Sequence, residues 1–259
     1  MIGTTADFPA ARASAVPMVT AAEMAEVDRL AVEDFGLDIL QLMEQAGSHL
    51  AELVRVELGG DLRGRRVIVA VGPGNNGGGG LAAARHLANR GASIRVVLAR
   101  PVNRLSEAGR HQLATLLQMS VDCCVAIYDV PDDELDREIA SADAVVDAIL
   151  GYRGLGPPQD GVLWLVERVG RATVPVISLD LPSGVEADTG DAPGAAVRAT
   201  ATLTLALSKP GLFRAAGRER AGRVFLGDIG LPAALYRRLG LEPGLPFAQG
   251  RIIRLEPDA

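Results

Sequence analysis

The chain has 259 residues and a formal net charge of −6, with 26 basic and 32 acidic side chains spread along its length. This balance argues against nucleic acid or an anionic membrane as the main partner, and no apolar run reaches the roughly 18 residues that span a bilayer. The composition is 48% hydrophobic but only 3% aromatic. The core must therefore be built from Ala, Val, Leu and Ile, as in a parallel sheet flanked by helices.

Two further features of the sequence indicate the compartment. The N-terminus lacks the charged and then apolar pattern of a signal peptide. Cys123 and Cys124 are adjacent, which is neither a C-x-x-C spacing nor a disulfide framework. We therefore expect buried structural cysteines and a cytoplasmic protein.

The N-terminal region divides into a tail and a helix. Residues 1–16 are rich in Ala, Thr, Ser and Pro without a period, which predicts a loose tail before a single domain over residues 17–259. A Thr-Ala-Ala-Glu capping box that begins at Thr20 predicts the start of a helix. Gly36 is expected to end this helix.

A second helix is predicted from about Asp38, because apolar residues recur at helical spacing from there. His49 lies within it, and no second ligand type is spaced to join this side chain in a metal site. We therefore expect His49 to be a hydrogen-bonded helix residue.

The central unit of the sequence is a strand, a glycine-rich loop and a helix in immediate succession. A β-branched run over 67–71 predicts the strand, six glycines fall within 72–80, and a helix is expected over 81–89. This arrangement presents free backbone N–H groups and a positive helix N-terminus to an anion, and glycine allows positive φ and close approach to a ligand. We predict a phosphate- or pyrophosphate-binding turn, to which Asn75 and Asn76 add carboxamides.

The glycine loop matches neither standard nucleotide motif. Residues 72–77 satisfy G-x-G-x-x-G, a pattern that is weak on its own. The next strand, over 94–98, is followed by Ala99 and Arg100, without the acidic residue that holds the ribose in the usual dinucleotide fold. A P-loop would need Gly-Lys-Ser/Thr, whereas Leu81 follows the last glycine.

Strands and helices alternate through the rest of the chain. Helices are expected over 103–119, from 131 and over 163–169, and strands over 94–98, 123–128, 144–148, 174–179, 199–207 and 223–226. This alternation predicts an α/β fold with a parallel sheet between helices, in which ligands lie beyond the C-terminal ends of the strands. The loops at 72–80, 147–158 and 180–184 should therefore converge.

Two aspartates end apolar strands, where a carboxylate is unexpected without a cation, a donor or a substrate nearby. These are Asp147 and Asp180, and Ser183 follows in a tight Pro-Ser-Gly turn. The alternative is a helix N-cap, but Asp147 comes too early for one and Asp180 precedes a proline-glycine turn. Asn76, Asp147 and Ser183 offer hard oxygen ligands, which suit a group I or II cation and not zinc.

The order and spacing of several sequence blocks resemble a known family. TAAEM and LMEQAG, then GPGNNGG with GLAAARHL, then DAILG and LDLPSG are similar to the NAD(P)H-hydrate epimerase family, the YjeF N-terminal domain. The resemblance covers roughly residues 19–230. It implies a Rossmann-like three-layer α/β/α fold with a mainly parallel central sheet, usually in a homodimer.

The same resemblance implies a role in nucleotide repair. Members interconvert the R and S epimers of hydrated NADH or NADPH, called NADHX and NADPHX, by inverting the carbon that bears the added hydroxyl. A separate ADP- or ATP-dependent NAD(P)H-hydrate dehydratase can then repair both epimers.

Site residues carry over block by block. The resemblance implies a potassium ion at Asn76, Asp147 and Ser183, and an acidic substrate contact at Asp180, which is also the remaining acid/base candidate. Lys209, in a Ser-Lys-Pro-Gly block, either helps to hold phosphate or is a surface lysine. The implied substrate loops comprise Asn75, Asn76, Gly77, Gly78 and Gly79, and Gly151, Tyr152, Arg153, Gly154, Leu155, Gly156 and Pro157.

Two departures from the family pattern concern the expected pocket. The family reads NNGGDG, and Gly79 stands where it has the aspartate. Losing a positioned acid/base group lowers a rate by roughly 10²–10⁴. The second loop usually reads G-x-G, whereas here Tyr152 and Arg153 lie between Gly151 and Gly154.

Three interpretations of the function therefore stay open. The first is an isomerase, an epimerase of NADHX and NADPHX. The second is a catalytically impaired nucleotide-binding or scaffold module of the same fold, and the third is an unrelated nucleotide-dependent transferase or oxidoreductase. Retention of the polar residues above favours the first, whereas Gly79 and Arg153 favour the second.

Overall fold

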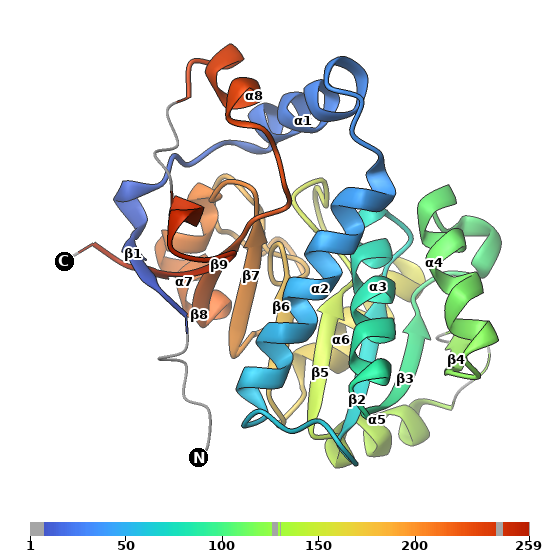
Figure 1. Ribbon diagram of the computed structural model, residues 1–259. Helices are drawn as coiled ribbons and strands as arrows, with labels where there is room; N and C mark the ends of the chain where they lie inside the picture. Colours follow the sequence, from blue (N-terminus) through green and yellow to red (C-terminus); the bar gives the residue numbers. More distant parts are fainter. Residues whose placement is uncertain (1–7, 126–128, 130, 242–245, 259) are drawn as a thin grey trace.

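A single mixed sheet forms the middle layer of the molecule (Figure 1). The computed structural model describes residues 8–125, 129, 131–241 and 246–258. Within these residues the strand order is β1-β9-β8-β7-β6-β5-β2-β3-β4, and only the β8–β9 pair is antiparallel. The strands are β1 (Ala10–Arg12), β2 (Arg66–Val71), β3 (Ser93–Leu98), β4 (Asp122–Val125), β5 (Ala144–Ala148), β6 (Val176–Leu179), β7 (Ala201–Leu205), β8 (Arg223–Gly227) and β9 (Ile252–Glu256).

Helices cover both faces of this sheet, as the sequence predicts. The α-helices are α1 (Ala21–Arg29), α2 (Ile39–Glu57), α3 (Asn75–Asn89), α4 (Glu107–Gln118), α5 (Asp132–Ser141), α6 (Asp160–Gly170), α7 (Ala215–Ala221) and α8 (Ala233–Arg238). A π-helical turn, Leu30–Asp34, extends α1, and 3-10 turns cover Ala13–Ala15, Val102–Arg104, Pro210–Phe213 and Pro246–Ala248. None of the helices in the described part of the chain has the length and apolar character needed to cross a membrane.

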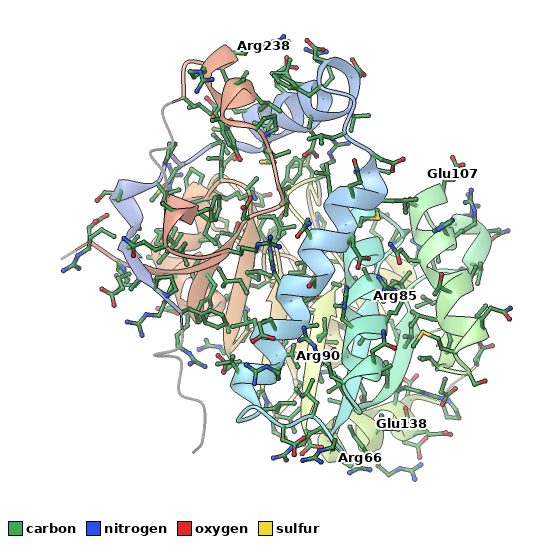
Figure 2. All side chains as sticks on the ribbon, viewed as in Figure 1. Arg66, Arg85, Arg90, Glu107, Glu138 and Arg238 are labelled. Carbon is green, nitrogen blue, oxygen red and sulfur yellow. The ribbon has the colours of Figure 1, made fainter. Side chains whose placement is uncertain are left out.

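Two apolar cores separate the three layers. Because alternate strand residues point to opposite faces, Val67 and Val69 of β2 pack with α2, α3 and α4, whereas Ile68 packs with α5 and α6. Figure 1 shows α2 and α3 crossing one face of the sheet, with α1 and α8 beyond the carboxyl ends of the parallel strands. In Figure 2, the labels Arg66 and Glu138 lie at the opposite end of the sheet. The predicted three-layer α/β/α fold is thus confirmed.

The first two helices begin where the capping signals place them. The Thr20 backbone N–H donates to the Glu23 carboxylate at 2.7 Å, and the Glu23 N–H donates to Thr20 Oγ1 at 3.2 Å. Gly36, with φ of +68°, follows the end of this helical segment. Asp38 caps α2 by accepting the Leu40 N–H at 2.7 Å.

The expectations about His49 and Cys124 are also confirmed, whereas Cys123 is less buried than expected. His49 Nε2 lies 2.8 Å from the carbonyl oxygen of Asp228, so this helix histidine is hydrogen-bonded. Cys123 is half-buried, Cys124 is buried, and neither forms a disulfide. Burial raises the pKa of the Cys123 thiol to about 11 and that of Cys124 to about 12, which keeps both unreactive at neutral pH.

The helix after the glycine run starts six residues earlier than the sequence predicts. α3 begins at Asn75 and not at Leu81, so the glycines from Gly77 to Gly80 belong to its first turns. None of the glycines over 72–80 has a positive φ. The expectation that these glycines supply unusual backbone conformations is therefore wrong.

Close packing explains the glycines of α3. A Cβ at Gly78 would lie 2.6 Å from the sulfur of Met43, and a Cβ at Gly80 would lie 2.4 Å from the Cβ of Ala148. The absence of side chains thus lets α3 approach both α2 and β5. Arg85 and Arg90 form salt bridges with acidic residues of α2 on the solvent side of the α2–α3 contact. Both arginines are labelled in Figure 2.

The edge of the sheet near the chain ends differs from the sequence expectation. Residues 10–12 of the expected loose tail form β1, which pairs with β9 in parallel, while residues 1–7 lie outside the described part. β9, α7 and α8 were also not predicted. A strand is predicted over 123–128, and the structure shows β4 up to residue 125. Residues 126–128 of this prediction lie outside the described part.

Candidate functional site

A cavity of about 420 Å³ opens at the carboxyl ends of the central strands, where residues of α1 also line it. All three loops that the sequence expects to converge contribute to it, through residues 73–76, 149–154 and 179–180. Apolar side chains of α1 and α2, including Met24, Leu42 and Met43, line the opposite wall. The cavity therefore combines an apolar wall with polar groups at the strand ends, the usual composition of a small-molecule site.

Asp180 is held inside this cavity by a buried ion pair. Its backbone φ is +68°, a conformation that is uncommon outside glycine. Carboxylate oxygen Oδ1 accepts from Lys209 Nζ at 2.6 Å, and Oδ2 accepts from the Tyr152 backbone N–H at 2.9 Å. Both oxygens of Asp180 are thus engaged, and its side chain is only 6% exposed.

Lys209 is the ion-pair partner of Asp180, and the sequence alone left two alternatives for its role. Its side chain is 1% exposed, so the surface-lysine alternative is wrong. Besides Asp180, its ammonium donates to the Leu205 carbonyl at 3.0 Å and to Thr204 Oγ1 at 3.3 Å. These three bonds use the donors of the ammonium group, which leaves none for a phosphate in this arrangement.

A second carboxylate, which the sequence reasoning missed, lines the same cavity. Asp28 Oδ2 accepts from the Tyr152 hydroxyl at 2.6 Å and from Arg153 Nη2 at 3.3 Å. Arg153 Nε also donates to the Tyr152 hydroxyl at 2.8 Å. A signal was available, because Asp28 lies four residues after Met24 and therefore on the inward face of α1.

Tyr152 joins the two carboxylates of the cavity. Its backbone N–H binds Asp180, and its hydroxyl binds Asp28. Burial is the main cause that raises the pKa of Tyr152, followed by the charge of Asp28, so the phenol remains protonated. The exposed Arg153 guanidinium lies 5.4 Å from the Tyr152 ring centroid, which places its charge at the mouth of the cavity.

Of the three candidate cation ligands, Asp147 and Ser183 are hydrogen-bonded to each other, whereas Asn76 is bonded elsewhere. Asp147 is fully buried, and burial raises the pKa of its carboxyl group. It accepts from Ser183 Oγ at 2.5 Å, from the Ser183 N–H at 2.9 Å, from Ser178 Oγ at 2.8 Å and from the Ile149 N–H at 3.3 Å. Asn76 Nδ2 instead donates to the Leu179 carbonyl at 3.2 Å.

Within the part of the chain that the structure describes, no three His, Cys, Asp or Glu side chains lie together as a metal site. The same residues offer no basic side chain as an ion-pair partner for Asp147. Among the described residues, the groups that contact this buried carboxylate are hydrogen-bond donors.

Position 79 has no acidic side chain, and a side chain there would require a neighbouring residue to move. Gly79 lines the cavity, and a Cβ built there would lie 2.8 Å from Leu179 Cδ2. A leucine methyl group therefore occupies the space into which a side chain at this position would extend. The first N–H groups of α3, from Asn75 onward, lack partners within the helix and begin at the same wall.

Eight of the residues predicted to contact substrate line the cavity, and five do not. The lining residues are Asn75, Asn76, Gly79, Gly151, Tyr152, Arg153, Gly154 and Asp180. Gly77 and Gly78 are instead buried in the packing of α3, and the second loop leaves the cavity at Leu155, Gly156 and Pro157. Leu155 is 81% exposed and Gly156 has a φ of +72°, as in a surface turn.

Comparisons with known proteins agree on one family. A family described as YjeF-related protein N-terminus matches residues 39–211. The chain is 41% identical over 249 residues to an NAD(P)H-hydrate epimerase of Dehalogenimonas lykanthroporepellens, covering 96% of each chain. It is 36% identical to an NAD(P)H-hydrate epimerase of Pirellula staleyi, covering 84% of this chain and 94% of that one.

Other similar proteins are longer or solved as structures. A bifunctional NAD(P)H-hydrate repair enzyme of Moorella thermoacetica is 38% identical over 219 residues, and this chain matches 41% of its length. The crystal structure of the yeast protein ynu0, YNL200c, superimposes with a TM-score of 0.79 at 25% identity, covering 93% of this chain and all of that one.

Proposed function

The chain belongs to the family of YjeF-related protein N-termini, and we propose that it is an NAD(P)H-hydrate epimerase that interconverts the R and S epimers of NADHX and NADPHX. Full-length similarity to proteins of that name supports this function. The observation that carries it in the structure is Asp180, a carboxylate fixed by Lys209 inside a cavity at the N-terminus of α3.

The cavity has separate regions for the two ends of such a substrate. The free N–H groups at the N-terminus of α3 suit a phosphate group, and Asn75 and Asn76 stand beside them. The apolar wall of α1 and α2 suits the hydrated nicotinamide ring. The exposed Arg153 adds a positive charge at the rim, where a second phosphate can reach it.

Epimerisation requires proton transfer to or from the hydroxyl group on the carbon that is inverted. The two epimers interconvert through a dehydrated or a ring-opened intermediate, and either route moves a proton on or off the hydroxyl. Asp180 is the acid/base group that the family resemblance assigns to this step. Lys209 and the Tyr152 N–H fix both of its oxygens, so its orientation is set before substrate arrives.

We further propose that Asn76, Asp147 and Ser183 hold a potassium ion. The donor set fits, because amide, carboxylate and hydroxyl oxygens are hard ligands and Asp147 is a buried charge that lacks a basic partner among the described residues. When bound, the ion would offset the charge of Asp147 and add positive potential near the phosphates of the substrate.

The remaining proposals concern assembly and compartment. We propose a cytoplasmic homodimer, supported by the family resemblance, whose product is consumed by a separate ADP- or ATP-dependent NAD(P)H-hydrate dehydratase. Relatives named as bifunctional repair enzymes support such a coupling of steps.

The second candidate function is a binding module without turnover. Its support is the methyl group of Leu179, which fills the space beside Gly79 where the family pattern has an aspartate. The two functions differ in one measurable property. An epimerase accelerates the exchange between the epimers, whereas a binding module binds them and leaves the rate at its spontaneous value.

The test starts from one purified epimer of NADHX in potassium buffer and follows the appearance of the other by chromatography. We expect the natural chain to accelerate exchange well above the spontaneous rate. A Gly79→Asp variant is measured beside it. If only that variant is active, the binding-module interpretation holds for the natural chain, and if neither is active, the epimerase proposal is wrong.

A further inference from the structure

Asp28 differs from Asp180 in how freely its carboxylate faces the cavity. Its side chain is 26% exposed, compared with 6% for Asp180. Both hydrogen bonds that it accepts go to Oδ2, and no described residue donates to Oδ1. In contrast, both oxygens of Asp180 are occupied by Lys209 and Tyr152. Asp28 is thus the carboxylate of this cavity with an oxygen that no described protein donor engages, whereas each oxygen of Asp180 keeps only its second lone pair for a ligand.

The two carboxylates come from different walls of the cavity. Asp28 projects from α1, and Asp180 directly follows β6. Tyr152 fixes them relative to each other, through its hydroxyl on one side and its backbone N–H on the other. Inverting a carbon through a planar intermediate requires proton transfer on both faces of the ring, and groups on separate walls meet that need.

The electrostatic surroundings of Asp28 favour a group that can carry a proton. Burial is the largest influence and raises its pKa. The hydrogen bond from Tyr152 and the charges of Arg153 and Lys209 act in the opposite direction, whereas the charge of Asp180 adds to the rise. The net shift is upward, which brings the pKa closer to neutral pH, as acid/base catalysis requires.

We propose that Asp28 is the second proton-transferring group of this cavity and takes the role of the aspartate that Gly79 replaces. The proposal rests on the epimerase function proposed above. It assigns the step to residues of this chain, with Asp28 and Asp180 serving the two faces of the hydrated ring.

In the dehydration route, protonated Asp28 donates its proton to the substrate hydroxyl. The C–O bond breaks and water leaves, while the lone pair of the ring nitrogen forms the new C=N bond. Water then adds to the other face of the planar ring and gives its proton to Asp180. Proton exchange with solvent restores both carboxyl groups, so no other reactant is consumed.

The decisive variant is Asp28→Asn, which preserves shape and removes the transferable proton. With NADHX epimers as substrate, we expect kcat to fall by roughly 10²–10⁴, while binding of NADHX is retained. Wild-type kcat should decline as pH rises through the raised pKa of Asp28, and this alkaline limb should be absent from the residual activity of the variant. Glu26→Gln, on the solvent side of α1, is the matched control and should behave as wild type.

A second variant separates proton transfer from a structural role. Tyr152→Phe removes a hydrogen bond to the ionised form of Asp28, so the pKa of Asp28 should rise and the alkaline limb should move to higher pH. A purely structural aspartate would give no such shift.

The two proposals fail in different ways. An inactive wild-type chain overturns the epimerase function and this inference with it. An active wild type with an equally active Asp28→Asn variant overturns this inference alone, as does an alkaline limb that Tyr152→Phe leaves in place.

Discussion

Replacing Lys209 with Met tests how the site residue Asp180 is held. The ammonium of Lys209 is the only cation that the described residues place in contact with this buried carboxylate, at 2.6 Å. Removing one partner of a buried ion pair leaves an uncompensated charge, which destabilises a protein by about 3–5 kcal/mol. The side chains are 1% and 6% exposed, so solvent cannot take the place of the lost partner. We expect the free energy of unfolding to fall within this range.

Urea denaturation of three chains measures this effect, namely wild type, Lys209→Met and the double variant Asp180→Asn/Lys209→Met. The double variant should recover most of the loss, because it removes both charges together. Two-state behaviour with an unchanged denaturant slope is the control for a comparable unfolding transition. A loss of under about 1 kcal/mol in Lys209→Met, as for an exposed pair, would refute the buried ion pair.

Three further predictions concern the scaffold and its pH dependence. Gly80→Ala should lower the free energy of unfolding by about 1–3 kcal/mol through overpacking against Ala148, whereas Gly74→Ala, with open space around its Cβ, should be milder in thermal denaturation. Thr20→Ala should lower it by about 1 kcal/mol through the lost cap, in the same assay. Asp28→Asn should raise the free energy of unfolding at neutral pH but not at acid pH, as measured by urea titrations. An equal change in this free energy at both pH values would contradict the prediction.

The ionised Asp28 carboxylate destabilises the folded chain at neutral pH, because burial raises its pKa. The folded-state pKa is raised above the ordinary value of 3.8, so the folded chain holds this proton more tightly than the unfolded chain does. The stability of the wild type therefore decreases as pH rises from 3.8 through the raised pKa. The carboxamide of Asp28→Asn does not titrate, so the variant escapes this loss.

Local patterns were sufficient to predict the central strands and the starts of α1 and α2. The apolar run Ala144–Ala148 coincides with β5, and the capping box at Thr20 marks the start of α1. The strand-end rule correctly placed Asp180 at the cavity. These features depend on residues that are close together in the sequence, so a single chain contains the whole signal.

The features that the sequence did not predict depend on distant partners. Gly78 and Gly80 of α3 leave room for Met43 and Ala148, which lie on other elements. This contact is visible only in the folded chain. The sequence leaves Lys209 open between a phosphate contact and a surface residue, and its contact with Asp180 is visible only in the folded chain. β1 has three residues and gains its place from β9, more than 200 residues later in the sequence.

The most direct test of the epimerase function is the rate at which one pure NADHX epimer reaches equilibrium. We expect catalytic amounts of the wild-type chain to drive this exchange at a rate proportional to protein concentration. The double variant Asp28→Asn/Asp180→Asn should bind NADHX and leave the exchange at its spontaneous rate. A wild-type rate equal to the spontaneous one, or a double variant as fast as wild type, would contradict the assignment of this cavity as an epimerase site.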